Sequence, residues 1–113
     1  MKRLVIQISK FSVILDGLIA DNKLSREDFW KFEDLLVDYP DTGDVIQGTG
    51  GLRKTRLKSA SKGKSGGFRV CYCDVPEKGK LFLVAIFPKN VQENLSSEEK
   101  SFLKKLIESL RAE

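Results

Sequence analysis

Gly43-Asp-Val-Ile-Gln-Gly-Thr-Gly-Gly-Leu-Arg-Lys-Thr-Arg-Leu57 is the stretch from which we predict the fold of this 113-residue chain. Its glycine-rich part, residues 48–51, favours a tight turn, and the residues after it are typical of a strand. It is not a nucleotide-binding P-loop, because Leu-Arg rather than Lys-Ser or Lys-Thr follows the glycines. A second strand is predicted over residues 67–73, which read Gly-Phe-Arg-Val-Cys-Tyr-Cys.

Side chains on these two predicted strands give the first indication of a site. Successive side chains of a strand point to opposite faces, so Lys54 and Arg56 share one face and lie about 7 Å apart. If the two strands pair, Arg69 reaches the same surface. We therefore expect three cationic side chains to meet on one face of a sheet.

The positive charge of the chain is concentrated in the same region. Between Asp44 and Asp74 the sequence has seven lysines and arginines and no acid. They are Arg53, Lys54, Arg56, Lys58, Lys62, Lys64 and Arg69. The whole chain carries a net charge of only +4, so the remainder is slightly acidic. A concentrated field of one sign favours a polyanionic partner, and nucleic acid is the obvious candidate.

The rest of the sequence predicts one α+β domain spanning residues 1–113. An apolar content of 41% is enough for a single core without metal or disulfide bonds. Further strands are expected over residues 3–8 and 81–87, and the second of these lacks polar alternation and should lie inside the sheet. The expected order is strand, helix, helix, three strands and helix. This order predicts a small, mostly antiparallel sheet with two N-terminal helices and one C-terminal helix.

The three predicted helices have recognisable signals. Ser25 with Asp28, and Ser96 with Glu99, have the spacing of capping boxes. Apolar residues recur at intervals of three and four, which predicts one buried face on each helix. These residues are Phe11, Ile14, Leu15, Leu18 and Ile19, then Phe29, Phe32, Leu35, Leu36 and Tyr39, and finally Phe102, Leu103, Leu106, Ile107 and Leu110.

The residue types exclude several kinds of active site. The chain has no His, which excludes a Ser-His-Asp triad and a Cys-His pair. Cys71 and Cys73 are interpreted as small buried hydrophobic residues, because two thiols alone do not make a structural zinc site. We expect no metal and no cofactor. Any catalysis must then use lysine, arginine, carboxylate, tyrosine or backbone groups.

No segment of the sequence is typical of membrane insertion or export. The longest apolar run, residues 81–87, is much shorter than the roughly 20 residues that span a bilayer. The N-terminal residues lack the apolar segment and cleavage site of a signal peptide. We therefore expect a cytoplasmic protein that does not bind membranes.

Three segments of the chain resemble one protein family. They are residues 43–57, quoted above, residues 63–72 with the sequence Gly-Lys-Ser-Gly-Gly-Phe-Arg-Val-Cys-Tyr, and Phe87-Pro-Lys-Asn90. In order and spacing the chain resembles the RelE/ParE superfamily of bacterial toxins, and most closely the HigB branch of RelE-type messenger-RNA interferases. The resemblance implies a RelE-like fold and the toxin of a type II toxin–antitoxin system. Such a toxin is a ribosome-dependent endoribonuclease that cleaves mRNA and inhibits translation.

Metal-independent RNA cleavage makes three chemical demands. The ribose 2′-hydroxyl must lose a proton, the phosphate must be compensated for its developing charge, and the leaving oxygen must gain a proton. Arg69 suits the second demand, because its forked donors can engage two phosphate oxygens at once. A lysine among other cations gives up its proton more readily, so Lys54 is a candidate general base or a group that exchanges protons with the leaving oxygen. Arg56 and Lys89 are expected to hold the RNA backbone.

The resemblance implies the same assignments. Lys54 and Arg56 match the pair of basic residues two apart on a strand of the RelE-type enzymes, and Arg69 matches the arginine after their Gly-aromatic dipeptide. The predicted catalytic residues are therefore Lys54, Arg56, Arg69 and Lys89. We expect the other basic or polar residues to contact RNA without taking part in the chemistry. These are Arg53, Lys58, Lys62, Lys64 and Asn90.

The resemblance also implies partners, and it leaves two other functions open. The expected partners are the ribosome, mRNA and a cognate antitoxin, commonly one with a helix-turn-helix domain that brings operator DNA to the complex. One alternative is a ParE-like toxin that poisons gyrase, although such chains generally lack the catalytic basic set. The other is a non-catalytic RNA-binding module that uses the same cations for binding alone.

Overall fold

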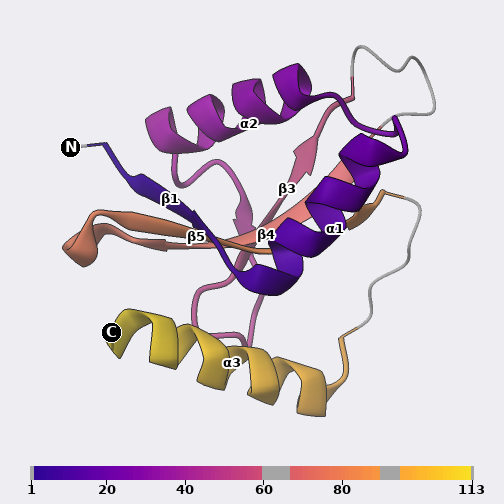
Figure 1. The fold of residues 1–113 in the computed structure, drawn as a ribbon. Coiled ribbons are helices and arrows are strands. Elements are labelled where there is room, and N and C mark those ends of the chain that lie inside the picture. The colour runs from indigo at the N-terminus through magenta and orange to yellow at the C-terminus, as the bar shows by residue number, and fades with distance from the viewer. Residues whose placement is uncertain (1, 60–66, 90–94, 113) are drawn as a thin grey trace.

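The computed structural model describes residues 2–59, 67–89 and 95–112 (Figure 1). The elements in chain order are β1 (Leu4–Gln7), α1 (Ser9–Ala20), α2 (Arg26–Asp38), β2 (Asp44–Val45), β3 (Arg53–Leu57), β4 (Phe68–Val75), η2 (Pro76–Lys78), β5 (Lys80–Pro88) and α3 (Ser97–Ala112). The predicted α+β class is confirmed. The structure adds β2, whose two residues are too short to show a strand pattern in the sequence.

One sheet joins the strands in the order β1-β5-β4-β3-β2. β1 runs parallel to β5, and the other neighbouring pairs are antiparallel. The predicted interior position of β5 is confirmed, because it lies between β1 and β4. Its apolar residues are therefore buried from both sides of the sheet, as the missing polar alternation indicated.

The helices cover the two faces of the sheet unequally. Figure 1 shows α1 and α2 on one side of the sheet and α3 on the other. The core on the α1/α2 side includes Phe11, Phe29 and Phe32, whose rings pack against Tyr72 and the other inward residues of β3, β4 and β5. The core on the α3 side is built mainly from the opposite side chains of β4 and β5 together with Ile107 and Leu110. Two helices thus cover one face, and a single helix covers the other.

Both predicted capping boxes mark helix starts. The Ser25 hydroxyl accepts a hydrogen bond from the backbone N–H of Asp28 at 3.0 Å. At α3 the exchange is reciprocal: the Ser96 N–H donates to the Glu99 carboxylate at 3.0 Å, and the Glu99 N–H donates to the Ser96 hydroxyl at 3.1 Å. These bonds satisfy backbone N–H groups that the first turn of a helix leaves unpaired.

The buried stripes of the helices are narrower than the sequence predicts. Four residues of the predicted stripes are exposed, namely Ile14 at 38%, Leu35 at 44%, Tyr39 at 61% and Phe102 at 68%. The pattern was wrong at these positions because each helix packs on only one side, against a sheet of small area. A residue at the border of the apolar stripe then lies at the edge of the contact between helix and sheet, where it is exposed to solvent.

A buried tyrosine fixes the connection between α2 and β2. The Tyr72 hydroxyl donates to the Pro40 carbonyl at 2.8 Å and accepts from the Gly43 N–H at 2.9 Å. A side chain at position 43 would bring its Cβ within 2.7 Å of the Lys54 carbonyl oxygen, so glycine is needed for this close approach. The loop is thereby held against β3, directly beside the basic residues of that strand.

Candidate functional site

The register of β3 and β4 brings three cations onto one face of the sheet. Arg56 lies opposite Arg69, and Lys54 lies opposite Cys71. Residues that face each other across antiparallel strands project on the same side, so Lys54, Arg56 and Arg69 share a face. We call these three residues the cationic ladder. The predicted meeting of the three side chains on one surface is confirmed.

The ladder lies on the α3 side of the sheet. Cys71, the partner of Lys54, belongs to the core beneath α3, as do Ala85 and Phe87, which lie opposite Cys71 and Arg69 on β5. Lys54 and Arg69 are partly buried, whereas Arg56 is exposed. The cations therefore rise from the same surface on which α3 packs, next to the part that α3 covers.

The charges of the ladder oppose folding. Arg56 and Arg69 face each other directly, and like charges in this position destabilise a sheet. Within the described residues the recorded ion pairs join Arg3 to Asp74, Lys31 to Glu27 and Arg111 to Glu77, and none of them involves the ladder. The acid that faces the ladder is Asp44 of β2, which lies opposite Lys54, although no ion pair between the two is recorded in the described part of the chain. Three cations against one carboxylate still leave a positive local field, which suits binding of a polyanion.

Lys89 is held at the edge of the same region. Its N–H donates to the Gly67 carbonyl at 3.3 Å, so it follows β5 at the end where β4 begins. A Cβ on Gly67 would lie 3.2 Å from the Lys89 side-chain Cδ, which means that the lysine stem crosses directly over this glycine. Gly67 also has a φ of +148°, which favours glycine. Lys89 therefore lies beside the start of β4, where Gly67 is two residues before Arg69.

Arg53 lies on the opposite face from the ladder. It pairs with Tyr72 on the α1/α2 side of the sheet. Its guanidinium donates to the Gly43 carbonyl at 2.6 Å and to the Asp41 carbonyl at 3.4 Å. Arg53 therefore helps Tyr72 to hold the α2–β2 loop, and the structure does not bring it together with Lys54 and Arg56.

The remaining predicted RNA contacts are only partly described. Lys58 is exposed immediately after the end of β3. Lys62, Lys64 and Asn90 lie outside the described residues. Of the predicted site, the structure therefore places the ladder, Arg53, Lys58 and Lys89.

The glycine-rich loop before β3 serves as a turn. Thr49 is fully buried, and its hydroxyl donates to the Ile46 carbonyl at 2.6 Å and accepts from the Leu52 N–H at 3.2 Å. Gly48 and Gly50 have positive φ and pack against the stems of Lys100 and Lys104 on α3. The loop thus turns the chain into β3, as predicted, and ties that strand to α3.

A cavity beside the ladder was not predicted from the sequence. It has a volume of about 440 Å³ and lies between the sheet and the first half of α3. The sheet contributes Cys71, Ala85 and Phe87, and α3 contributes Glu98, Phe102 and Leu103. The strand alternation would have placed Cys71 and Phe87 on the ladder's face. The space itself depends on how far α3 stands from the sheet.

Two groups with acid–base chemistry are set apart from the ladder by burial. Burial raises the pKa of the Tyr72 phenol and the pKa of the Cys73 thiol. Tyr72 is occupied with the Pro40 carbonyl, and Cys73 lies in the core beneath α3. Cys71 and Cys73 are both buried, as expected from the sequence. The candidates for catalytic residues on the α3 face are therefore the cations of the ladder.

Comparison with known families identifies the chain. A model of the family described as the RelE toxin of the RelE / RelB toxin-antitoxin system matches residues 43–112. This range includes β2, β3, β4, β5 and α3, and hence every residue of the ladder. In the described part of the chain, no helix combines the length and apolar character needed to cross a membrane. Because the match covers more than half of the sequence, the chain belongs to the RelE toxin family, the toxins of toxin–antitoxin pairs.

Proposed function

We propose that this toxin is a metal-independent endoribonuclease that cleaves messenger RNA on the ribosome and thereby inhibits translation. The observation that carries the proposal is the shared face of Lys54, Arg56 and Arg69 in a chain of the RelE toxin family. An RNA-binding module would use the same cations for binding alone, and a gyrase poison does not need three cations at one point on a sheet. A scissile phosphodiester does, because negative charge develops on it during the reaction.

Stabilisation of the phosphate falls to the two arginines. Arg69 engages two non-bridging oxygens through its forked donors. Arg56, directly opposite on β3, binds the same or the neighbouring phosphate. Both side chains start from paired strands rather than loops, so little reorganisation is needed when charge develops in the transition state.

Proton transfer falls to Lys54. It lies on the same face as Arg56 and two residues away along β3, a spacing of about 7 Å. From there its amine can take the proton of the ribose 2′-hydroxyl while Arg69 holds the phosphate. Attack of the 2′-oxygen on phosphorus then forms a 2′,3′-cyclic phosphate and releases the 5′-oxygen, which takes up the proton that the Lys54 amine received. Lys89 holds the RNA backbone at the edge of the site.

The ribosome and the antitoxin complete the proposal. Arg56 is exposed and Lys54 and Arg69 are partly buried, so the message would reach the ladder from solvent, and the ribosome would supply its orientation. A cognate antitoxin follows from the family, and we propose that it blocks or distorts the ladder. An antitoxin with a helix-turn-helix domain would also carry the complex to operator DNA.

Translation in vitro, followed by primer extension on the message, tests the reaction. The wild-type toxin is expected to create new 5′ ends on mRNA that is being translated. The same message without ribosomes is the control, and it should be cut far more slowly. Unchanged message ends, together with double-strand DNA breaks in cells that express the toxin, would overturn the proposal in favour of a gyrase poison.

A further inference from the structure

The cavity between α3 and the sheet continues directly from the cationic ladder. Cys71 forms part of its wall and is the strand partner of Lys54, and Phe87 is another wall residue and the strand partner of Arg69. Neighbouring strands are about 5 Å apart. The cavity therefore begins one strand spacing from the cations that are proposed to hold the scissile phosphate.

A backbone irregularity widens the apolar floor of this cavity. Cys71 pairs with Ala85 and Tyr72 pairs with Leu83, so Val84 is an extra residue in β5. Both Val84 and Ala85 line the cavity as a result of this bulge. A bulge of this kind re-aims side chains, and bulges are common beside binding sites.

The chemistry of the cavity selects the part of a nucleotide that fits. Its walls are mainly apolar, and the carboxylates among the described lining residues are Glu98 and Glu99. A carboxylate repels a phosphate, so the phosphates remain on the ladder. A flat, uncharged ring system suits apolar walls, and a volume of about 440 Å³ is within the range of small-molecule sites.

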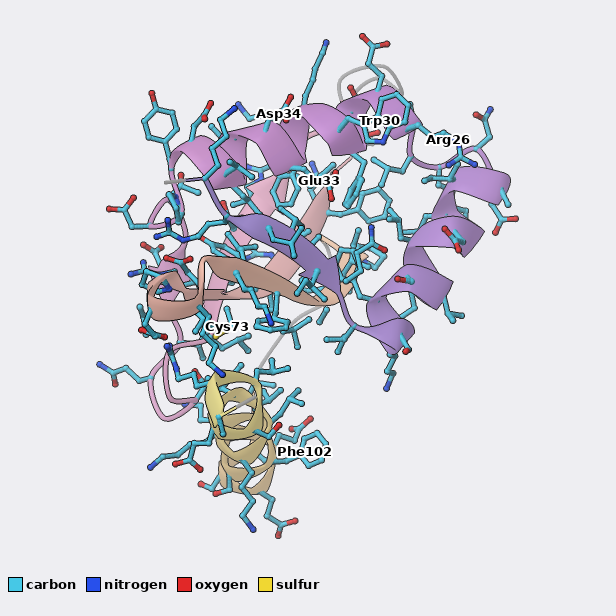
Figure 2. The ribbon with its side chains drawn as sticks, turned by 60° about the vertical axis from the view of Figure 1, so that its left-hand side comes forward. Arg26, Trp30, Glu33, Asp34, Cys73 and Phe102 are labelled. Atoms are coloured by element: carbon cyan, nitrogen blue, oxygen red, sulfur yellow. The ribbon has the colours of Figure 1, made fainter. Side chains whose placement is uncertain are left out.

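Phe102 supplies a surface on which such a ring can stack. Its side chain is 68% exposed although it lies at the border of the apolar stripe of α3, and it forms part of the cavity wall. Figure 2 shows it projecting from the side of α3. Nucleobases stack on aromatic rings whatever their sequence, and such stacking anchors single-stranded RNA.

We propose that the cavity between α3 and the sheet binds one nucleobase of the RNA whose phosphates lie on the ladder, with the base stacked on Phe102. The proposal rests on the function proposed above and adds a base-binding site to it. Glu98 lies at the same wall and, when ionised, only accepts hydrogen bonds. It therefore favours a base with an exocyclic amine, such as cytosine, over uracil.

Binding of short RNA at low salt tests the site without relying on cleavage. The probe is a fluorescent oligoribonucleotide with 2′-O-methyl riboses, which cannot be cut, and a series in which one base at a time is replaced by an abasic sugar. The protein variants are Phe102→Ala, Phe102→Tyr and the control Trp30→Ala. Trp30 is also an exposed aromatic residue, 59% accessible, but it lies on α2 across the sheet from α3 (Figure 2).

Phe102→Ala is expected to weaken binding of the complete oligonucleotide by about 5- to 150-fold, as for the loss of one stacked base. Phe102→Tyr, which keeps the ring, and Trp30→Ala should bind as the wild type does. One abasic position should weaken the wild type by a similar factor and leave Phe102→Ala unaffected, because the two changes remove the same contact. At that position the wild type should prefer cytosine to uracil, and Glu98→Gln should reduce the preference.

Equal losses in the wild type and Phe102→Ala at every abasic position would overturn the base site. Unchanged RNA binding by Phe102→Ala with weaker binding of the antitoxin would also overturn it, and would assign the cavity to an apolar side chain of the antitoxin. Failure of the proposed cleavage reaction can be distinguished from failure of the base site. In that case translated messages stay intact, while the Phe102-dependent base contact persists in the binding assay.

Discussion

The two faces of the sheet put neighbouring residues of one strand to different uses. On the α1/α2 face, Arg53 meets Tyr72 and holds a loop through backbone carbonyls. On the α3 face, the next residue, Lys54, stands beside Arg56 and Arg69 with no ion pair recorded among the described residues. The first face is covered by two helices (Figure 1), and its Arg53 and Tyr72 side chains are hydrogen-bonded to backbone groups of the loop before β2. The second face is covered by one helix, and its cations remain available to a ligand. Alternate residues of β3 therefore serve different purposes: Arg53 supports a loop on the first face, and Lys54 and Arg56 form the candidate site on the second.

The two faces should also differ in how much an aromatic side chain contributes to the stability of the fold. Phe29 is 3% exposed in the core of the α1/α2 face, whereas Phe102 is 68% exposed on α3. We expect Phe29→Ala to lower the free energy of unfolding by about 3–5 kcal/mol, because it leaves a cavity. Phe102→Ala should change it by less than about 0.5 kcal/mol. Urea unfolding monitored by circular dichroism measures both, and equal losses would contradict the comparison.

Replacing an arginine on the α3 face should slow mRNA cleavage, whereas replacing one on the α1/α2 side should not. We expect Arg69→Ala to slow mRNA cleavage by about 10²–10³-fold, because a preorganised donor to the phosphate is lost. The unfolding midpoint should not fall, since removal of Arg69 relieves its repulsion with Arg56. Arg26→Ala, on exposed α2, is the matched control and should cleave normally. Cells that express Arg69→Ala and stop growing at the wild-type level would show that Arg69 is not catalytic.

Two tyrosine substitutions test whether the Tyr72 hydroxyl anchors the loop between α2 and β2. Tyr72→Phe leaves the Gly43 N–H and the Pro40 carbonyl without their partner, which should cost about 1–3 kcal/mol of folding free energy. Tyr39→Phe removes a hydroxyl from a side chain that is 61% exposed and should cost almost nothing. Thermal unfolding compares the two variants. A stable Tyr72→Phe protein would mean that the hydroxyl does not anchor the loop.

The smallest expected effect concerns the capping box of α3. Hydrogen bonds from the Ser96 N–H, and then from its side chain, lower the pKa of Glu99 from its ordinary value of 4.5. A depressed pKa in the folded state stabilises the protein above pH 4.5, and this contribution is lost as the pH falls through the folded-state pKa. Glu99→Gln should therefore be slightly less stable than the wild type at pH 7 and equal to it in acid.

Unfolding midpoints between pH 7 and pH 3 measure the difference. Glu108→Gln, which removes one charge from an exposed position of the same helix, is the control. If Glu99→Gln and Glu108→Gln shifted the midpoint in parallel at every pH, the carboxylate of Glu99 would have no special role at the start of α3.

Much of the fold could be predicted from the sequence because its signals are local. The apolar spacing of the helices, the two capping boxes and the unbroken apolar run of β5 each depend on residues close together in the chain. The ladder could be predicted for the same reason, since strand alternation fixes the face of Lys54 and Arg56, and the following strand carries Arg69.

Other features depend on contacts that no local pattern encodes. β2 has two residues and exists because it pairs with β3. The bulge at Val84 and the cavity beneath α3 result from how β4, β5 and the helix fit together. Phe102 has the spacing of a core residue, but its exposure reflects the limited width of the sheet under α3. Arg53 belongs to the basic run, and strand alternation places it on the opposite face from Lys54, but its hydrogen bonds to the Asp41 and Gly43 carbonyls depend on how the loop before β2 folds.

The most direct test uses the two neighbouring cations on β3. Lys54→Ala and Arg53→Ala are measured side by side for the rate of mRNA cleavage during translation and for the unfolding midpoint. We predict that Lys54→Ala slows cleavage by about 10²–10⁴-fold, as for loss of a general base, with an unchanged midpoint. Arg53→Ala should lower the midpoint and leave cleavage by the folded protein intact. Equal loss of cleavage in both variants, or an active Lys54→Ala protein, would contradict the division of labour between the two faces.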